Sequence, residues 1–255
     1  MKYIDILRDG PVTFIKINRP EAMNSITDEM HSDLNTAFDD FSSDKNQLVA
    51  VISGEGGKAF CAGSDLKDGI NGSYPRGGYA GLINRFDLAK PVIAAVDGYA
   101  LGGGFELALA CDLILASKRS LFGLPEPLVG AVALGGGLHR LPRQIGQKNA
   151  MEIILTSRKY TADEGLRMGF VNKVATHDKL MDVVKKYCDD ILKGAPLAIQ
   201  ASKMTVKRGL SEDSLKAALV KQESYDEFIK WRNSDDALEG VKAFSEKRKP
   251  HWTGS

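Results

Sequence analysis

The chain has 255 residues, of which 43% are apolar and 26% charged, as expected of an ordinary globular protein able to bury a sizeable core. Its formal net charge of +1 gives no bulk attraction to nucleic acid or to an anionic membrane surface. The beginning carries an acid at Asp5 and no apolar h-region, so no secretory signal is expected, and no apolar run approaches the roughly 20 residues of a membrane span.

The first part of the chain predicts alternating strands and helices. Residues 3–7 and 12–17 alternate apolar and polar side chains around Asp9-Gly10, which predicts a β-hairpin. A helix is expected after Thr27, a plausible N-cap. Its apolar positions recur at helical spacing: Met30, Leu34, Ala37, Phe38 and Phe41.

Apolar runs then predict buried strands at 48–52, 91–96 and 113–116, and a helix at 104–110. Between the strands, residues 54–63 form a glycine-rich loop. Residues 67–78 contain glycine, serine, proline and asparagine and predict a mobile surface loop. This order of strand, loop and helix is typical of an α/β core.

Helical periods dominate from about residue 147 onward, and only residues 171–174 look extended. The helices are expected at 147–155, 161–168, 177–192, 196–208, 211–230 and 235–246. We therefore predict two parts, an α/β core at 1–194 and a helical C-terminal region at 195–255. No repeat of 20–50 residues and no low-complexity tract is present.

Cysteine and histidine usage predicts a reducing compartment and no metal ion. The cysteines Cys61, Cys111 and Cys188 form no CxxC or Cys/His ligand spacing, and their number is odd. The histidines form no HxxxH or HxH pair; they are His31, His139, His177 and His251. We expect buried or free thiols, a cytoplasmic protein and no metal site.

Two glycine-rich segments allow different interpretations. Gly102-Gly103-Gly104 precedes a predicted helix, where free N–H groups and the helix dipole suit an anion, but close packing of strand and helix explains it equally well. Residues 54–59 follow a strand and fit G-x-G-x-x-A, the loose dinucleotide pattern. Residues 60–64 do not open an amphipathic helix, and Ala59 stands where a P-loop requires Ser or Thr, so a nucleotide cradle is disfavoured.

Two glutamates lie next to such segments. Glu106 stands on an almost wholly apolar helix, where a carboxylate either faces a cleft or undergoes costly burial, although an acid in a first helical turn can also simply complement the dipole. Glu126 has a proline on each side, which restricts its backbone and could aim its carboxyl group, although it could also be an ordinary turn residue. Together they suggest acid/base chemistry beside an anion hole.

Four motifs follow one another along the chain. They are N-R-P-x-x-x-N at 18–24, A-F-x-A-G-x-D-L-K at 59–67, the segment 90–107 around the three glycines, and F-x-E-K-R at 244–248. Together they resemble the crotonase, or enoyl-CoA hydratase/isomerase, superfamily over nearly the whole chain. The resemblance implies an α/β fold built as a crotonase-like (ββα) superhelix core, with a helical C-terminal trimerisation region.

The resemblance also implies the site residues. The backbone N–H groups of Ser64 and Gly103 would form the oxyanion hole for an acyl-CoA thioester, with Glu106 and Glu126 as catalytic residues. The residues expected to contact coenzyme A or substrate are Ala22, Ala62, Asp65, Leu66 and Lys67, together with Phe244 and Lys247 from a neighbouring subunit. Coenzyme A is then part of the substrate, no separate cofactor is expected, and the protein is expected to be a homotrimer or a dimer of trimers.

Hydratases of the superfamily resemble this chain in having both carboxyl groups, so the resemblance favours syn addition of water across the 2,3-double bond, with Glu126 as general acid at C2 and Glu106 orienting and activating the water. Double-bond isomerisation or other acyl-CoA chemistry on the same site is the alternative. RNA binding, known for some crotonase-fold proteins, is remote because no basic stripe with interleaved aromatic residues exists.

Residues 77–82 and 234–240 look most like carnitinyl-CoA dehydratases (crotonobetainyl-CoA hydratases) within the superfamily. After Glu126, residues 131–137 depart from the I-P-G-A-G-G type of many hydratases. The resemblance implies that this stretch flanks the acyl pocket, so the departure concerns the acyl group more than the reaction.

Overall fold

The structure is a computed structural model that describes residues 1–65 and 74–255. The chain forms two compact units, Met1–Arg85 with Val92–Lys186 and Phe86–Pro91 with Tyr187–Ser255. The first unit contains both β-sheets, and the second is built almost entirely of helices. Within the described ranges, no helix is both long and apolar enough to cross a membrane.

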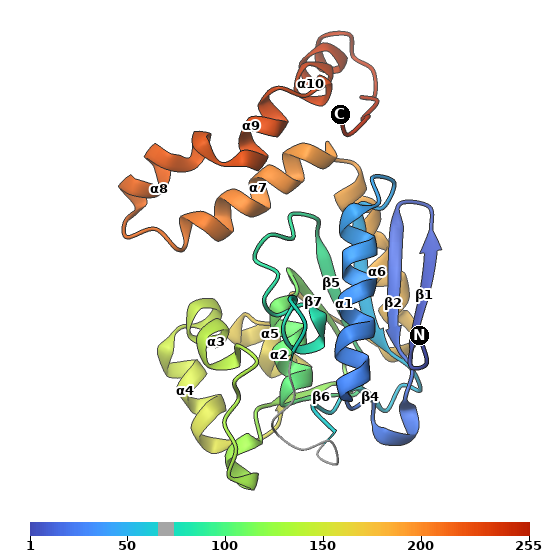
Figure 1. The fold of residues 1–255 in the computed structure, drawn as a ribbon, viewed down its shortest axis with the longest axis vertical. Helices are drawn as coiled ribbons and strands as arrows, with labels where there is room; N and C mark the ends of the chain where they lie inside the picture. The colour runs from blue at the N-terminus through green and yellow to red at the C-terminus, as the bar shows by residue number, and fades with distance from the viewer. Residues whose placement is uncertain (66–73) are drawn as a thin grey trace. The chain divides into compact units, whose positions relative to one another are not determined.

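The larger sheet of the first unit has six strands in the order β1-β2-β3-β5-β7-β10 (Figure 1). Its strands are β1 (Ile4–Asp9), β2 (Val12–Ile17), β3 (Val49–Gly54), β5 (Val92–Val96), β7 (Leu113–Ser117) and β10 (Lys173–Ala175). The β1–β2 pair is antiparallel and turns at Gly10, which has φ +53°, so the predicted hairpin is confirmed. The remaining pairs are parallel, as the continuous apolar runs of β3 and β5 indicate.

A smaller sheet of four strands was not predicted. It has the order β4-β6-β8-β9, formed by β4 (Ala59–Cys61), β6 (Tyr99–Leu101), β8 (Leu121–Gly123) and β9 (Tyr160–Thr161). β4, β6 and β8 are parallel, and each follows directly on a strand of the larger sheet. The chain therefore passes three times from the large sheet into the small one. Because β4, β6 and β8 are parallel, the segments that follow them all leave the small sheet at its carboxyl end.

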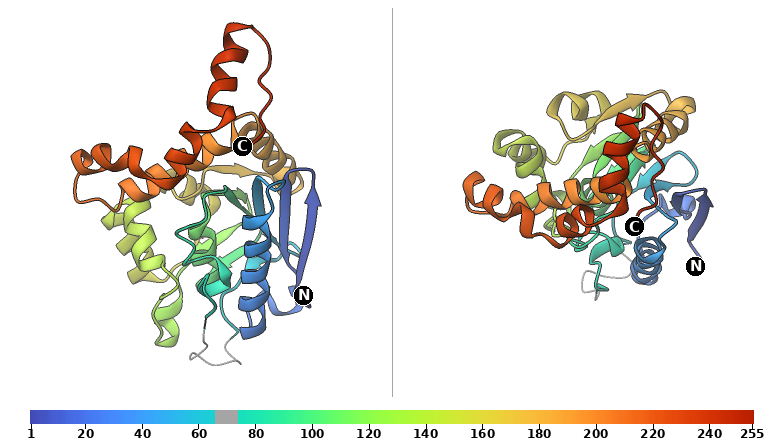
Figure 2. Two further views of the ribbon diagram at one scale, coloured as in Figure 1. Left: turned by 45° about the horizontal axis from the view of Figure 1, so that its top comes forward. Right: turned by 90° about the horizontal axis from the view of Figure 1, so that it is seen from above.

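The helices of the first unit begin with α1 (Asp28–Ser43), which lies alongside the β1–β2 hairpin in Figure 1. Thr27 accepts a hydrogen bond from the Met30 N–H, and all five predicted apolar positions of this helix are buried. The further helices are α2 (Gly103–Ala110), α3 (Gly137–Ile145), α4 (Gln147–Thr156), α5 (Ala162–Met168) and the short 3₁₀ turns Pro20–Ala22, Tyr79–Gly81, Glu126–Val129 and His177–Lys179. Figure 2 shows α3 and α4 side by side in both views.

In the second unit the predicted helix over 211–230 is wrong as a single element. The structure has α8 (Leu215–Lys221), a 3₁₀ turn (Gln222–Ser224) and α9 (Asp226–Arg232) in that range. Ser214 caps α8 through a hydrogen bond from the Ala217 N–H, and Tyr225 is extended (φ −71°, ψ 137°), which ends the helical backbone between α8 and α9. The other helices are α7 (Pro196–Gly209), α10 (Asp235–Ser245) and α6 (Leu180–Leu192), which begins in the first unit.

Candidate active site

Three segments that leave the small sheet at its carboxyl end meet in one place. A Cβ on Gly63, after β4, would lie 3.4 Å from the Gly103 nitrogen at the start of α2. A Cβ on Gly102 would lie 3.0 Å from Oε1 of Glu126, which follows β8. Because parallel strands bring their carboxyl ends to one edge, residues far apart in the sequence are collected there.

Two backbone N–H groups point to an anion-binding function for this edge. The parallel bridge between Ile26 and Ser64 uses the Ile26 N–H and the Asp65 N–H, and it leaves the Ser64 N–H without an acceptor among the described residues. Gly103 is the first residue of α2, and its N–H also has no acceptor in the described part of the chain. These are the amides that the sequence predicted as a pair; a Cβ on Gly63, the residue before Ser64, would lie 3.4 Å from the Gly103 nitrogen.

Both interpretations of the three glycines have a basis in the structure. Gly102 adopts φ 55° and ψ −129°, a backbone conformation that turns the chain from β6 into the helix. A Cβ on Gly104 would overlap the backbone oxygen of Cys61, and one on Gly103 would overlap the Tyr79 ring. Close packing therefore accounts for Gly104, whereas the turn at Gly102 places the first N–H groups of α2 at the site.

Glu106 is buried in the first turns of α2, with 3% of its surface exposed. Its Oε1 accepts a hydrogen bond of 2.8 Å from the Gly137 N–H. A Cβ on Gly135 would overlap Oε2, so a second glycine triplet, 135–137, makes room for this carboxyl group. Burial raises the pKa of Glu106 to about 7, the neighbouring Glu126 carboxyl raises it too, and the Gly137 and Gly135 N–H groups lower it.

Glu126 begins the 3₁₀ turn after β8, between Pro125 and Pro127. Gly130, in the left-handed conformation, donates a hydrogen bond to the Glu126 carbonyl and closes the turn. The Oε2 atom of Glu126 is buried and has no hydrogen-bond partner among the described residues. Burial raises the pKa of this carboxyl group as well. Both carboxyl groups thus have raised pKa values, but Glu106 accepts a hydrogen bond from Gly137 whereas Oε2 of Glu126 has no partner among the described residues. Such a pair is suited to general acid and general base catalysis.

Arg140 in α3 is a further charged group of the site that the sequence did not reveal. Its Nη2 donates a 2.7 Å hydrogen bond to the Ile83 carbonyl, and its charge lowers the pKa of Glu106. Burial lowers the pKa of Arg140 itself. The helix at 137–145 was not predicted from the sequence, so the arginine on its buried side could not be placed at the site.

The first motif of the sequence acts as a support for this edge. The Asn24 side chain is fully buried and donates hydrogen bonds to the carbonyls of Glu55 (3.0 Å) and Ala59 (2.6 Å). Arg19 forms an ion pair of 2.7 Å with Asp65. The chain after β4 is thereby fixed to the 18–24 loop.

The residues predicted to contact coenzyme A or substrate fall into three groups. The Ala62 N–H donates to the carbonyl of Met23, the neighbour of Ala22, at 3.0 Å, and Asp65 contacts the same segment through its ion pair with Arg19. Leu66 and Lys67 lie outside the described residues. Phe244 and Lys247 belong to the second unit, where Phe244 lies in the last turn of α10 with 87% of its surface exposed and Lys247 adopts φ 53°.

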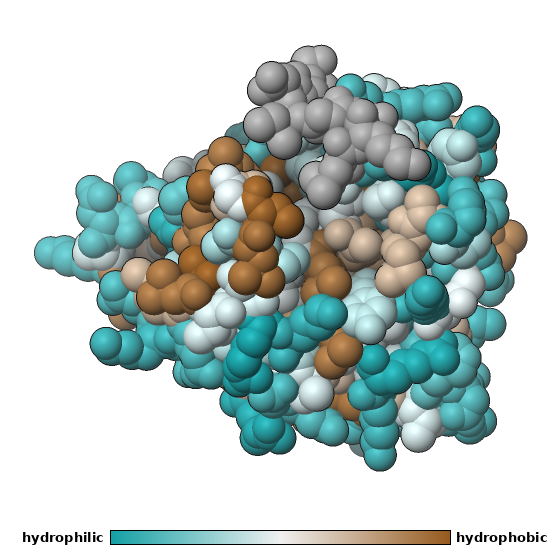
Figure 3. Space-filling view, turned by 90° about the horizontal axis from the view of Figure 1, so that it is seen from below, coloured by the Kyte–Doolittle hydropathy of each residue, from teal (hydrophilic) through white to brown (hydrophobic). Residues whose placement is uncertain are grey.

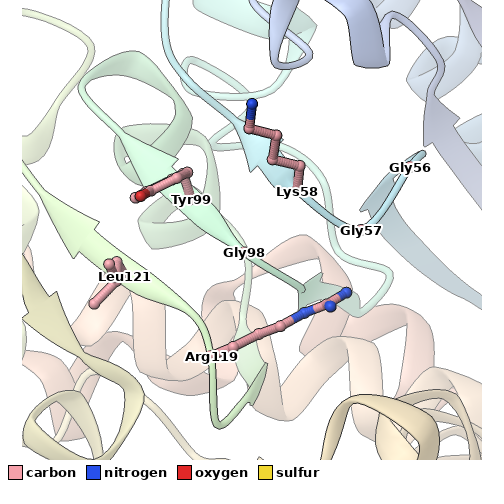
Figure 4. A pocket seen from close by; sticks show the side chains of 7 residues that line it. All are labelled: Gly56, Gly57, Lys58, Gly98, Tyr99, Arg119 and Leu121. Atoms are coloured by element: carbon pink, nitrogen blue, oxygen red, sulfur yellow. The ribbon is translucent and has the colours of Figure 1, made fainter.

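A surface cavity of about 380 Å³ lies at the opposite, amino end of the small sheet (Figure 4). The Arg119 side chain extends there towards Gly57, and its guanidinium forms two hydrogen bonds with Asp97. The 56–58 loop leads into β4 instead of a helix, so the loop lacks the helix N-terminus that the dinucleotide alternative requires. Nowhere in the described ranges do three or more His, Cys, Asp or Glu side chains group as a metal site would need.

Comparison with known proteins gives consistent matches. The sequence matches the family described as Enoyl-CoA hydratase/isomerase over residues 8–255. It is 42% identical to carnitinyl-CoA dehydratase of Proteus mirabilis over 252 residues (96% of each chain), and 41% identical to carnitinyl-CoA dehydratase of Salmonella paratyphi A over 258 residues (98% of each chain). The fold is similar to the crystal structure of enoyl-CoA hydratase from Mycobacterium tuberculosis, with TM-score 0.92, 38% identity and 99% of each chain covered.

Proposed function

The chain belongs to the enoyl-CoA hydratase/isomerase family, the crotonase superfamily, and on that premise we propose that it adds water reversibly across the 2,3-double bond of an enoyl-CoA thioester. The reverse direction is dehydration of a 3-hydroxyacyl-CoA. The observation that carries the proposal is the meeting of two carboxyl groups of raised pKa with two backbone N–H groups that lack acceptors among the described residues. The carboxyl groups suit movement of water and a proton, and the amides suit a developing oxyanion.

In the proposed reaction the Ser64 and Gly103 N–H groups bind the thioester oxygen. Attack at C3 pushes electrons through C2 onto that oxygen and produces an enolate-like transition state. Donors already in place at that point stabilise the negative charge, each by about 3 kcal/mol for an oxyanion-hole donor.

The two carboxyl groups hold the water between them. Glu106 accepts a proton as the water oxygen bonds to C3, and Glu126 delivers a proton to C2 on the same face of the double bond. The sum is one OH at C3 and one H at C2, and the pair keeps one proton overall. Burial favours this, because it raises the pKa of both groups and disfavours two charges side by side.

The acyl group is proposed from the relatives. The proteins from Proteus mirabilis and Salmonella paratyphi A are named carnitinyl-CoA dehydratase, so we propose an acyl group like theirs as the first candidate. The departing stretch 131–137 supports a specialised acyl group, because it passes beside Glu106 at Gly135 and Gly137 and exposes Val132 and Leu134.

A panel of acyl-CoA thioesters tests this function. Crotonyl-CoA, a longer straight-chain 2-enoyl-CoA and crotonobetainyl-CoA are each mixed with the protein, and loss of the conjugated thioester absorbance reports hydration. A 3-enoyl-CoA is included, because gain of that absorbance reports isomerisation. Hydration of at least one 2-enoyl-CoA supports the proposal. Isomerisation without any hydration replaces it with the isomerase alternative.

Contacts with coenzyme A by Ala22, Ala62, Asp65, Leu66, Lys67, Phe244 and Lys247 are part of the same proposal. Removal of the adenosine phosphate groups from the substrate should therefore raise KM more than it lowers kcat. No separate cofactor enters the proposed reaction. We also propose a cytoplasmic location, supported by three cysteines that are all buried and form no disulfide.

Gly135→Ala is predicted to lower kcat by about 10²-fold, the effect of a misplacement of about 1 Å in a catalytic group. A methyl group at position 135 would overlap Oε2 of Glu106 and push the carboxyl group from its place. Steady-state kinetics on the best substrate of the panel measures the effect. Gly209→Ala is the matched control, since its Cβ would meet only the Ala218 methyl group at 3.6 Å. An unchanged kcat in Gly135→Ala would show that the glycine does not position Glu106.

We further propose a homotrimer or a dimer of trimers. The helices of the second unit expose apolar side chains that a monomer would leave in water: Leu215, Leu219, Val220, Leu238, Val241 and Phe244. Apolar residues also gather on part of the lower face of the molecule (Figure 3). Surfaces of this kind support association between copies of the chain.

The double substitution Leu238→Glu with Val241→Glu is expected to reduce the particle mass from three or six times 27.7 kDa to that of one chain. Both side chains are about three-quarters exposed on one face of α10, and charges there would be buried in an interface without partners. Light scattering coupled to size exclusion measures the mass. Leu7→Glu, an exposed site on β1, is the control. A wild-type mass of 27.7 kDa would reject the proposed oligomer.

A further inference from the structure

The Tyr79 hydroxyl is a buried polar group that the proposed reaction does not yet use. Tyr79 begins the 3₁₀ turn Tyr79–Gly81 and has only 3% of its surface exposed. Its hydroxyl oxygen is fully buried and has no hydrogen-bond partner among the described residues. A buried hydroxyl without a partner is unfavourable, so its retention calls for a reason, such as a ligand that completes it.

The hydroxyl lies among the residues of the oxyanion site. A Cβ on Gly103 would overlap both the Tyr79 hydroxyl and its ring carbon Cζ, so the phenol rests directly on the residue whose N–H is proposed as a donor. Burial raises the pKa of the Tyr79 phenol well above its ordinary value, and Cys61 and Glu106 add to this rise, whereas the Ser64 side chain opposes it. Tyr79 therefore has both proposed donor residues, Ser64 and Gly103, as neighbours.

The phenol ring is held in place from the side of α1. His31 packs edge-on against it, with ring centroids 4.7 Å apart, and Nδ1 of His31 accepts a 2.9 Å hydrogen bond from the Ala80 N–H. Tyr74 packs against both rings, with centroids 5.0 Å from His31 and 5.9 Å from Tyr79. The hydroxyl thus has a fixed position and needs little reorganisation to donate to a ligand.

We propose that the Tyr79 hydroxyl donates a third hydrogen bond to the thioester oxygen of the bound substrate, beside the Ser64 and Gly103 amides. The proposal rests on the proposed function, because it assigns a further donor to the same oxyanion. The phenol remains protonated at any working pH, so it can only donate to the negative oxygen. A hydrogen bond to a charged acceptor corresponds to a rate factor of about 10- to 100-fold.

The test compares Tyr79→Phe with Tyr225→Phe in the full chain. Tyr225 is the matched control, because its hydroxyl is also buried without a partner among the described residues, but it lies in the second unit. Tyr79→Phe is expected to lower kcat by about 10- to 100-fold with little change in KM and no loss of thermal stability. Tyr225→Phe should leave kcat unchanged.

A vibrational measurement separates this role from a purely structural one. The carbonyl stretch of a bound enoyl-CoA, isolated with a ¹³C label at C1, should lie at lower frequency in the wild type than in Tyr79→Phe. Incorporation of 3-fluorotyrosine at position 79, a stronger donor of nearly the same size, should move the band to lower frequency than in the wild type.

Two results would overturn the proposal. One is an unchanged kcat in Tyr79→Phe. The other is a reduced kcat in Tyr79→Phe while the carbonyl band stays unchanged in both Tyr79→Phe and the 3-fluorotyrosine protein, which would mean that the hydroxyl contacts another part of the substrate. Failure of the wild type to hydrate any 2-enoyl-CoA is a different outcome, since it rejects the proposed function before Tyr79 is tested.

Discussion

Glu126→Gln is expected to lower kcat for hydration by at least about 10²-fold, the usual contribution of a positioned general acid. Glutamine keeps the size of the side chain and its fit against Gly102, but its amide cannot deliver a proton to C2. KM should change little, because the carboxyl group acts on the proton in the transition state more than on the bound ground state. Steady-state hydration of the best panel substrate measures both constants.

Solvent isotope exchange gives a second measurement for the same variant. Wild-type protein in D₂O should place deuterium at C2 of the product, and Glu126→Gln should lose this exchange together with hydration. Glu29→Gln, at an exposed position in the first turn of α1, is the control for a change of one charge. A Glu126→Gln variant with wild-type kcat would refute the acid role assigned to this residue.

The second large effect is expected in the pH dependence of kcat/KM and in its change when Glu106 is replaced by glutamine. The ionised form is needed to accept a proton from water, and the pKa of this group is raised to about 7 by burial. The kcat/KM of the wild type should therefore fall by about ten-fold for each pH unit below 7, since that parameter follows the ionisation of the free enzyme. Glu106→Gln should reduce kcat/KM by at least about 10²-fold at pH 8 and remove this acidic limb. An acidic limb that persists in residual Glu106→Gln activity would assign it to another group.

The raised pKa of Glu106 also affects the stability of the fold. Stability decreases as pH rises, whereas kcat/KM increases. The folded protein binds the proton more tightly than the unfolded chain, whose carboxyl pKa is 4.5, so the free energy of unfolding decreases as pH rises from 4.5 to about 7. The shift corresponds to about 3 kcal/mol. Glu106→Gln should thus be more stable than the wild type at pH 8 by up to this amount and equally stable near pH 4.5, as measured by denaturant unfolding.

Periodic apolar patterns made the larger elements predictable. In α1 the five buried positions and the Thr27 cap follow from local sequence, and β3, β5 and β7 are buried on both faces as their apolar runs require. The small sheet has strands of two or three residues, too short to carry a period, and its pairs depend on the large sheet lining them up. The break between α8 and α9 was not predicted because the apolar spacing continues through it. In the structure, α8 begins at the Ser214 cap and the extended backbone of Tyr225 separates the two helices.

For the candidate site, the sequence named residues but not their environment. The motifs named both glutamates and both amides, and the structure brings their segments to one edge. The groups that set the Glu106 pKa could not be found in this way, because the Gly137 N–H lies 31 positions away and Arg140 sits on an unpredicted helix. Tyr79 likewise becomes notable only when the packing shows that its hydroxyl lies against Gly103.

The stretch 131–137, after Glu126, has two parts that differ in how well they tolerate amino-acid substitutions. A Cβ on Gly135 would overlap Oε2 of Glu106, and one on Gly137 would lie 3.1 Å from its Cγ and Oε1, so larger residues at either position crowd this carboxyl group. Val132 and Leu134 are 59% and 81% exposed, and a change there leaves that carboxyl group alone. Substitutions at Val132 and Leu134 are therefore expected to leave the Glu106 carboxyl group in place, whereas substitutions at Gly135 or Gly137 are expected to displace it.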